Sequence, residues 1–167
     1  MNQIKVILPM VEITVMVKTT ETKKTISLYE RAVAYILNMP KTEKQVRQWY
    51  ARKTVDQGLI NVDIARLKES NLINDEDYAR MYVEAKKEKM GIGMIRNKLR
   101  INGVESSLIE QALIGVENQH DFALGCVEKY MRRKDKTPEN KSKLFRWLLG
   151  KGIGYDLCME VINEYWC

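Results

Sequence analysis

Three stretches of this chain resemble one another at a fixed offset of 49 residues, and this internal repeat limits the folds that the chain can adopt. The stretches share five apolar positions: Val46, Ile95 and Leu144; Tyr50, Leu99 and Leu148; Val55, Val104 and Ile153; Ile60, Ile109 and Cys158; Ile64, Leu113 and Ile162. A glycine precedes the third position at 103 and 152, where the first stretch has Thr54. Self-similarity at a fixed period is typical of repeat proteins, whose units bury apolar faces against their neighbours. We therefore expect a protein that acts through an extended surface and not through a catalytic pocket.

The composition favours a soluble protein with an anionic partner. The 167 residues are 45% apolar and 30% charged, and 28 basic and 22 acidic residues give a net charge of +6. A moderate positive charge of this kind favours an anionic partner. Three cysteines, at 126, 158 and 167, form no spacing typical of a metal site, so free thiols in a reducing cytosol are expected. Cys158 occupies a repeat position that is Ile elsewhere, which predicts a buried side chain.

The N-terminal part of the chain follows a different pattern. Residues 4–17 alternate between apolar and polar side chains around Pro9, which predicts a short hairpin or two edge strands. Residues 18–25 are polar and charged, and we predict that they form a linker. Glu12 and Thr14 interrupt the apolar stretch, so neither a secretory signal nor a membrane span is expected, and the protein is predicted to be cytoplasmic.

After residue 27 the apolar residues follow a helical period and predict nine helices in three triplets. Three candidate N-caps carry a hydroxyl or amide side chain directly before a helical run: Thr42, Asn74 and Thr137. Gln45 completes a capping box with Thr42, and glycines at 103 and 152 are expected to end two helices. In the second triplet, the inner face of the first helix is predicted to hold Tyr78, Met81, Tyr82 and Ala85.

The predicted fold is all-α, with a short N-terminal extended or β segment before three tandem three-helix repeats. We place the N-terminal segment and linker at 1–25 and the three helical repeats at 27–72, 73–117 and 118–167.

The repeat also organises charge. The predicted second helices are basic, with net charges of +4 over 41–53, +3 over 91–102 and +3 over 138–151. The predicted third helices are acidic, with −1 over 56–69, −3 over 105–117 and −3 over 156–164. If the units stack in one sense, the basic helices align and form a basic stripe that could meet phosphates or an acidic protein groove. The alternative is that these charges only keep a small helical protein soluble.

Several features look like chemical sites, but the sequence favours a simpler role for each. Gly91-Ile-Gly93 lacks the Lys and Ser/Thr of a phosphate loop and is predicted to begin a helix. The acids at 75–77 suit the positive end of a helix dipole, and His120 has no base or metal partner nearby in sequence. Helical spacing favours core packing over base stacking for the aromatic residues Trp49, Tyr78, Tyr82, Tyr130 and Trp147. We expect no enzyme activity, no cofactor and no metal site.

Two motifs occur in order along the chain. The first is Leu72-Ile-Asn-Asp-Glu-Asp-Tyr-Ala-Arg-Met-Tyr-Val, and the second is Ile95-Arg-Asn-Lys-Leu-Arg-Ile-Asn-Gly-Val followed by Leu108-Ile-Glu-Gln-Ala-Leu. Together they resemble the centre of the RecX regulatory proteins, which modulate the bacterial recombinase RecA, and residues 144–153 resemble the C-terminal repeat of that family. The resemblance covers about residues 27–166 and is strongest over 72–113.

The resemblance implies three three-helix repeats in an elongated, curved array that binds the groove of the RecA–DNA filament and bridges protomers. It also implies damping of ATP hydrolysis, strand exchange and LexA-type coprotease activity, and hence control of recombination and the SOS response. The expected partner is the RecA nucleoprotein filament, and the expected state is a monomer without membrane contact; weak binding to single- or double-stranded DNA is left open. Thr54 departs from the usual family glycine, and the N-terminal segment is shorter than in many relatives.

The candidate contact residues come from the charge pattern, because the family has no catalytic motif to transfer. They are cations on the predicted second helices or on the stretches before them: Lys86, Lys87, Lys89, Arg96, Lys98, Arg100, Arg132, Arg133, Lys143, Arg146 and Lys151. Each is predicted to act as a charge partner of the filament.

Two other interpretations stay open. A three-helix unit can mimic a helix-turn-helix, so the chain could be a stand-alone helical DNA-binding regulator, although its basic helices offer little Asn or Gln for reading bases. The third interpretation is a helical scaffold that binds another protein.

Overall fold

The computed structural model describes residues 6–8, 11–13, 26–116 and 119–167. Two short strands, β1 (Val6–Leu8) and β2 (Val11–Ile13), pair antiparallel with Val6 opposite Ile13. This pairing confirms the predicted hairpin for the residues that it covers, whereas the predicted linker at 18–25 lies outside the described residues.

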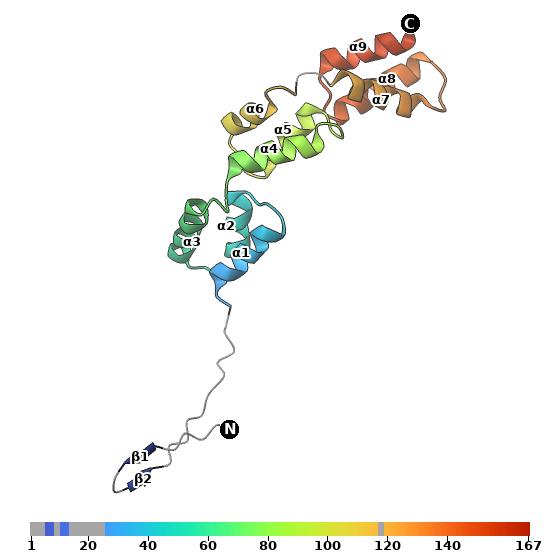
Figure 1. Cartoon of the computed structure of the whole chain (residues 1–167). Coiled ribbons are helices and arrows are strands. Elements are labelled where there is room, and N and C mark those ends of the chain that lie inside the picture. The colour runs from blue at the N-terminus through green and yellow to red at the C-terminus, as the bar shows by residue number, and fades with distance from the viewer. Residues whose placement is uncertain (1–5, 9–10, 14–25, 117–118) are drawn as a thin grey trace.

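Nine helices follow in the described ranges after residue 25, and they form an elongated row of three bundles (Figure 1). The first bundle contains α1 (Leu28–Asn38), α2 (Glu43–Ala51) and α3 (Gln57–Glu69). The second contains α4 (Asp75–Lys86), α5 (Ile92–Ile101) and α6 (Ser106–Leu113). The third contains α7 (His120–Met131), α8 (Pro138–Gly150) and α9 (Tyr155–Trp166). The predicted all-α fold with three triplets of helices is confirmed.

Each bundle closes its own apolar core. The repeat positions Val46, Ile95 and Leu144 are fully buried, and each belongs to a different cluster of buried side chains. Cys158 is also fully buried, as predicted, and its Sγ lies 3.6 Å from the carbonyl oxygen of Ile153. Because the three cores are separate, the bundles meet at narrow junctions and not in a shared interior.

The helices begin where their capping residues predict. Thr42 and Gln45 form the expected capping box at α2, with hydrogen bonds of 3.1 and 3.2 Å in the two directions. Asn74 accepts hydrogen bonds from two backbone N–H groups in the first turn of α4, and Thr137 caps α8. Gly91 is the N-cap of α5, which confirms that the Gly91-Ile-Gly93 stretch begins a helix.

One of the repeat positions differs between the bundles. Val55 is 92% exposed, whereas its counterparts Val104 and Ile153 are buried, so this apolar repeat position belongs to the core in two of the three bundles. The glycines before these counterparts have φ of +92° and +81°, which turns the next residue toward the core. Thr54 does not take such a φ, since Asn71 is the one non-glycine residue with positive φ in the described ranges.

The inner face of α4 also differs from the prediction. Met81 is 52% exposed and Ala85 is exposed, whereas Ala79 and Val83 are the buried pair. The reason is close packing between α4 and α6, which a small side chain at 79 permits. The flanking tyrosines are half-buried, and their stacked ring centroids lie 6.1 Å apart.

Candidate interaction surface

The second helices of the three bundles follow one another end to end. At one junction, the Thr42 hydroxyl at the start of α2 donates to the carbonyl of Asn102, which caps the end of α5, over 2.6 Å. At the other, the Gly91 N–H at the start of α5 donates to the carbonyl of Lys151, which caps the end of α8, over 3.0 Å. The two donors, Thr42 and Gly91, lie 49 residues apart in sequence, and so do the two acceptors, Asn102 and Lys151. The sequence repeat is therefore also a repeat of junctions.

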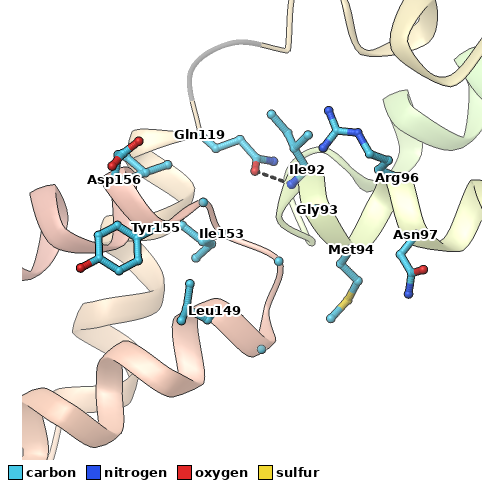
Figure 2. A pocket seen from close by; sticks show the side chains of 14 residues that line it. Ile92, Gly93, Met94, Arg96, Asn97, Gln119, Leu149, Ile153, Tyr155 and Asp156 are labelled. Atoms are coloured by element: carbon cyan, nitrogen blue, oxygen red, sulfur yellow. Dashed lines mark hydrogen bonds between the residues drawn. The ribbon is translucent and has the colours of Figure 1, made fainter. Parts of the chain in front are cut away.

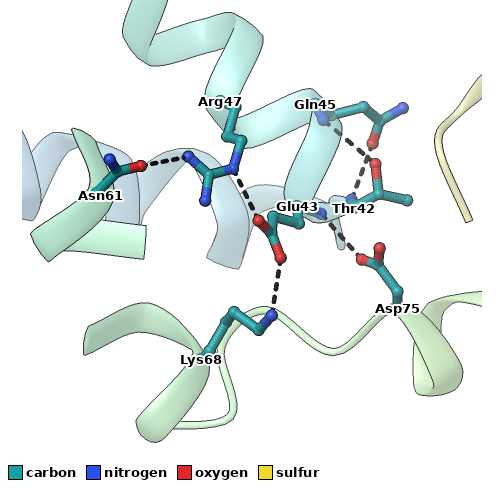
Figure 3. A network of polar contacts seen from close by, with 7 residues as sticks. All are labelled: Thr42, Glu43, Gln45, Arg47, Asn61, Lys68 and Asp75. Carbon is teal, nitrogen blue, oxygen red and sulfur yellow. Dashed lines mark hydrogen bonds and ion pairs between the residues drawn. The ribbon is translucent and has the colours of Figure 1, made fainter. Parts of the chain in front are cut away.

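A side chain from the start of the next bundle supports each junction. The N–H of Glu43, the first residue of α2, donates to Asp75 Oδ1 over 2.9 Å (Figure 3). The N–H of Ile92, the first residue of α5, donates to Gln119 Oε1 over 2.8 Å (Figure 2). Both contacts satisfy an N–H group that has no partner within its helix. Burial raises the pKa of the Asp75 carboxyl, although the hydrogen bond from Glu43 opposes this effect.

Glycines bring the chain into close contact at both junctions. A side chain at Gly152 would overlap the backbone of Met94 in the first turn of α5, and one at Gly103 would overlap the side chain of Lys44 in α2. These two glycines are one repeat apart, and so are the positions of Lys44 and Gly93. In the described part of the chain no bundle precedes the first, which explains why the equivalent position tolerates Thr54.

This arrangement brings the three net-positive helices, α2, α5 and α8, into a single row along the molecule. Six predicted contact residues have no ion pair, side-chain hydrogen bond or ring contact within the described residues: Lys86, Lys89, Lys98, Arg100, Arg132 and Arg133. Lys98 and Arg100 are exposed in the last turn of α5, where cations also interact favourably with the helix dipole. Their charges are therefore available to a partner, and they also stabilise the C-terminal end of α5.

Three other predicted contact residues are held by acids. Arg96 makes two hydrogen bonds to Glu110 in α6, of 2.7 and 2.9 Å, and this contact raises the pKa of Arg96 and lowers that of Glu110. Lys87 pairs with Glu84 at 2.9 Å, and Lys143 pairs with Glu139 at 2.6 Å. The structure thus divides the predicted set into cations that carry free charge and cations that are locally neutralised.

The last two predicted residues contact their own helix. Lys151 Nζ lies 5.1 Å from the centroid of the Trp147 ring, and Arg146 donates to the carbonyl of Ser142 over 3.4 Å. The eleven residues extend from the end of α4 to the end of α8. They remain predicted contacts.

Sequence reasoning missed the polar residues that hold the first junction. Lys44 Nζ donates to the carbonyl of Ile101 over 3.0 Å, and Glu43 pairs with Arg47 at 2.7 Å and with Lys68 at 2.8 Å (Figure 3). The hydrogen bond from Lys68 is the main cause that lowers the pKa of Glu43. The sequence contained one signal for the role of Lys44: it lies 49 residues before Gly93, at the equivalent position of the repeat.

Gln119 and His120 were missed because their partners are far away in sequence. The buried Gln119 amide donates to the carbonyls of Lys87 and Met90 over 3.0 and 2.9 Å. His120 Nε2 lies 2.8 Å from Glu164 Oε2, 44 residues away, and 3.9 Å from Glu160. Both residues fix the start of α7, one against the second bundle and one against α9.

Each junction carries an open groove. The groove at the junction of α5 and α8 has a volume of about 720 Å³ (Figure 2), and the groove at the junction of α2 and α5 has about 750 Å³. Arg96 lines one and Arg47 lines the other, one repeat apart. Within the described ranges, no helix has the length and apolar character to cross a membrane. In the same part of the chain, no three His, Cys, Asp or Glu side chains gather as a metal site.

Comparisons with known proteins agree on one family. Residues 74–113 match the family model described as RecX, second three-helix domain. The chain is 38% identical over 141 residues to the regulatory protein RecX of Clostridium botulinum (strain Alaska E43), covering 81% of this chain and 66% of that protein. It is 36% identical over 136 residues to that of Clostridium perfringens (strain 13), covering 75% and 64%. The match therefore spans slightly less than two thirds of the length of these relatives.

The fold has a counterpart among solved structures. The crystal structure of RecX from Lactobacillus salivarius superposes with a TM-score of 0.73 at 27% identity, covering 81% of this chain and 92% of that one.

Proposed function

Because the chain belongs to the RecX family of regulatory proteins, we propose that it binds the groove of the RecA–DNA filament as a monomer. It inhibits or modulates the ATPase, strand-exchange and coprotease activities of RecA, and so regulates recombination and the SOS response. Family membership supports a regulatory role, and the row of basic helices supports a partner that presents phosphates or an acidic protein groove.

The end-to-end row of second helices is the observation that carries this proposal. A filament repeats one protomer along its axis, and an elongated row of equivalent units can follow such a surface. The helices α2, α5 and α8 lie in that row, and eight predicted contact residues have no acid partner in the described ranges. Unpaired cations bind phosphates and acidic protein surfaces, whereas paired cations contribute less because their field is already cancelled.

The direct test is the ATPase rate of RecA on single-stranded DNA with and without this protein. We expect the rate to fall as the protein is added and to recover as salt is raised, because screening weakens contacts between exposed charges. An unchanged ATPase rate, with filament formation confirmed separately, would overturn the assignment.

DNA alone provides the second arm of this test. Binding to single- and double-stranded DNA is measured without RecA across a salt series. We expect weak binding that depends little on sequence and falls steeply with salt. Tight, sequence-dependent binding without RecA would instead favour the stand-alone DNA-binding regulator. Binding to another protein that requires neither RecA nor DNA would favour the helical scaffold.

A further inference from the structure

In the first and second bundles, the side chains at one pair of repeat positions form a hydrogen bond between the second helix and the third helix. The third bundle lacks this contact. In the first bundle, Arg47 in α2 donates to Asn61 Oδ1 in α3 over 2.9 Å. In the second, Arg96 in α5 makes its two hydrogen bonds to Glu110 in α6. The residues 49 positions further on are Phe145 in α8 and Met159 in α9. We call the first two contacts the arginine clasps.

Loss of the clasp leaves an apolar groove between α8 and α9. Its volume is about 400 Å³, and it is lined by Lys141, Ser142, Phe145, Arg146, Met159 and Ile162. Ile162 is 1% exposed and belongs to the floor, whereas Met159 is 38% exposed. The ring of Phe145 meets the ring of Tyr155 edge-on, with centroids 5.3 Å apart. The groove is therefore a shaped depression with aromatic and thioether walls.

Exposed apolar side chains continue from this groove toward the junction of α5 and α8. Tyr155 is 61% exposed and Leu149 is 40% exposed, and both line the groove at that junction together with Asp156. On α8, Ser142, Phe145 and Leu149 follow the helical spacing of one face, and Tyr155, Met159 and Ile162 do the same on α9. Two neighbouring helices with such ridges form the kind of groove that accepts the apolar face of a third helix.

The charge around the groove selects its occupant. Lys141 and Arg146 line it, no acid does, and neither has an ion pair within the described residues. The acids of α9 lie elsewhere: Glu160 and Glu164 contact His120 on the α7 side, and Asp156 lines the groove at the junction of α5 and α8. Glu139 on α8 is paired with Lys143. The edge of the groove is thus positive.

We propose that the α8–α9 groove is a docking site for an amphipathic helix of a partner protein, with an apolar stripe flanked by carboxylates. The apolar stripe fills the space beside Phe145 and Met159, and the carboxylates meet Lys141 and Arg146. The site lies on α8 and uses Arg146, which is also a predicted filament contact, but peptide binding to it is measured without RecA and without DNA. Its test can therefore fail while the proposed filament binding holds, and the reverse is also true.

The repeat itself supplies the variant that closes the groove. The double substitution F145R/M159E installs in the third bundle the arginine clasp that the second bundle already has. Because this pair is accommodated at the same register between α5 and α6, we expect the variant to fold, which circular dichroism and thermal melting check. The matched control V55S/V62S removes two exposed apolar side chains, 92% and 58% exposed, far from the groove.

The probe is a synthetic helical peptide with leucines at i, i+4 and i+7 and glutamates on both sides of that stripe. Binding is measured by the fluorescence anisotropy of the labelled peptide with the full chain, without RecA and without DNA. We expect saturable binding that F145R/M159E weakens by about tenfold or more and V55S/V62S leaves unchanged. A second peptide, with lysines in place of the glutamates, is expected to bind about tenfold more weakly.

Three results would overturn the proposal. The first is absence of saturable binding by the glutamate peptide, and the second is equal binding of both peptides or of both protein variants. The third is self-association of the chain, measured by sedimentation, that F145R/M159E abolishes; the groove would then be an interface between two copies of this chain.

Discussion

The hydroxyl of Thr42 donates a 2.6 Å hydrogen bond to the carbonyl of Asn102, which lies 60 residues further along the chain. The same hydroxyl accepts a hydrogen bond from the Gln45 N–H as the N-cap of α2. One buried side chain therefore starts a helix in the first bundle and satisfies a carbonyl at the end of a helix in the second. At the other junction, the donor in the equivalent position is the backbone N–H of Gly91. Only the junction between α2 and α5 therefore depends on a side-chain donor at this position.

The substitution Thr42→Ala is expected to destabilise the protein by about 1–3 kcal/mol, because it removes both the N-cap and the buried hydrogen bond. Thr42→Ser keeps the hydroxyl and is expected to cost less than about 1 kcal/mol. Urea unfolding followed by circular dichroism measures both values. Equal stability of the alanine and serine variants would show that the hydroxyl makes no net contribution.

The second junction is tested by Gly152→Ala. Gly152 has φ +81°, and a Cβ there would overlap the backbone of Met94, so both strain and a steric clash are expected. We expect a loss of at least about 1–3 kcal/mol in the free energy of unfolding. The control is Gly125→Ala in α7, where a Cβ meets nothing within 4 Å and helix propensity predicts a gain of about 0.5–1 kcal/mol. Loss of stability in both variants to the same degree would contradict the special role of Gly152.

Local features of the fold could be predicted from the sequence, and contacts between distant residues could not. Thr42 and Asn74 signal helix starts because a cap acts on N–H groups two or three residues away. Arg96 binds Glu110 14 residues away, and His120 meets Glu164 44 residues away, so tertiary packing sets both pairs. For the same reason, the charge pattern could not show that Arg96, a predicted filament contact, is paired with Glu110.

The carboxyl of Asp75 gives a test based on pH. Its pKa is raised, mainly by burial, so the folded state holds this proton more tightly than the unfolded state. Stability contributed by the protonated form is therefore lost as pH rises from the ordinary value of 3.8 through the raised pKa. Asp75→Asn keeps an oxygen for the Glu43 N–H and removes the buried charge, so we expect it to gain stability over the native chain across that pH range.

The comparison for Asp75 is the alanine variant. Asp75→Ala leaves the Glu43 N–H without its acceptor and is expected to lose about 1 kcal/mol at neutral pH. Chemical unfolding at a series of pH values separates the two effects. An advantage of the asparagine variant that stays constant at every pH would rule out the titration of Asp75 as its cause.

The proposed filament contact predicts a difference between two lysines in similar places. Lys98 and Lys129 are both exposed in the last turn of a helix, but only Lys98 is a predicted contact. We expect Lys98→Glu to raise the concentration of this protein that half-inhibits the RecA ATPase by about tenfold. The same increase is expected when Arg96 and Arg100 are also replaced by glutamate. Lys129→Glu removes the same favourable interaction with a helix dipole and is expected to change inhibition little. Equal effects of the two single variants would remove Lys98 from the contact set.

The pairing of Arg96 with Glu110 predicts a change in the opposite direction. Glu110→Gln removes the acid that holds the guanidinium, so Arg96 gains free charge beside the exposed cations Lys98 and Arg100. We expect stronger inhibition of the RecA ATPase at low salt, by a few-fold, with little loss of stability, because an exposed ion pair contributes about 0–1 kcal/mol. Glu128→Gln in α7 adds the same net charge without releasing a partner and serves as the control. If Glu110→Gln inhibits no better than Glu128→Gln, Arg96 acts as a clasp between α5 and α6 and not as a contact of the filament.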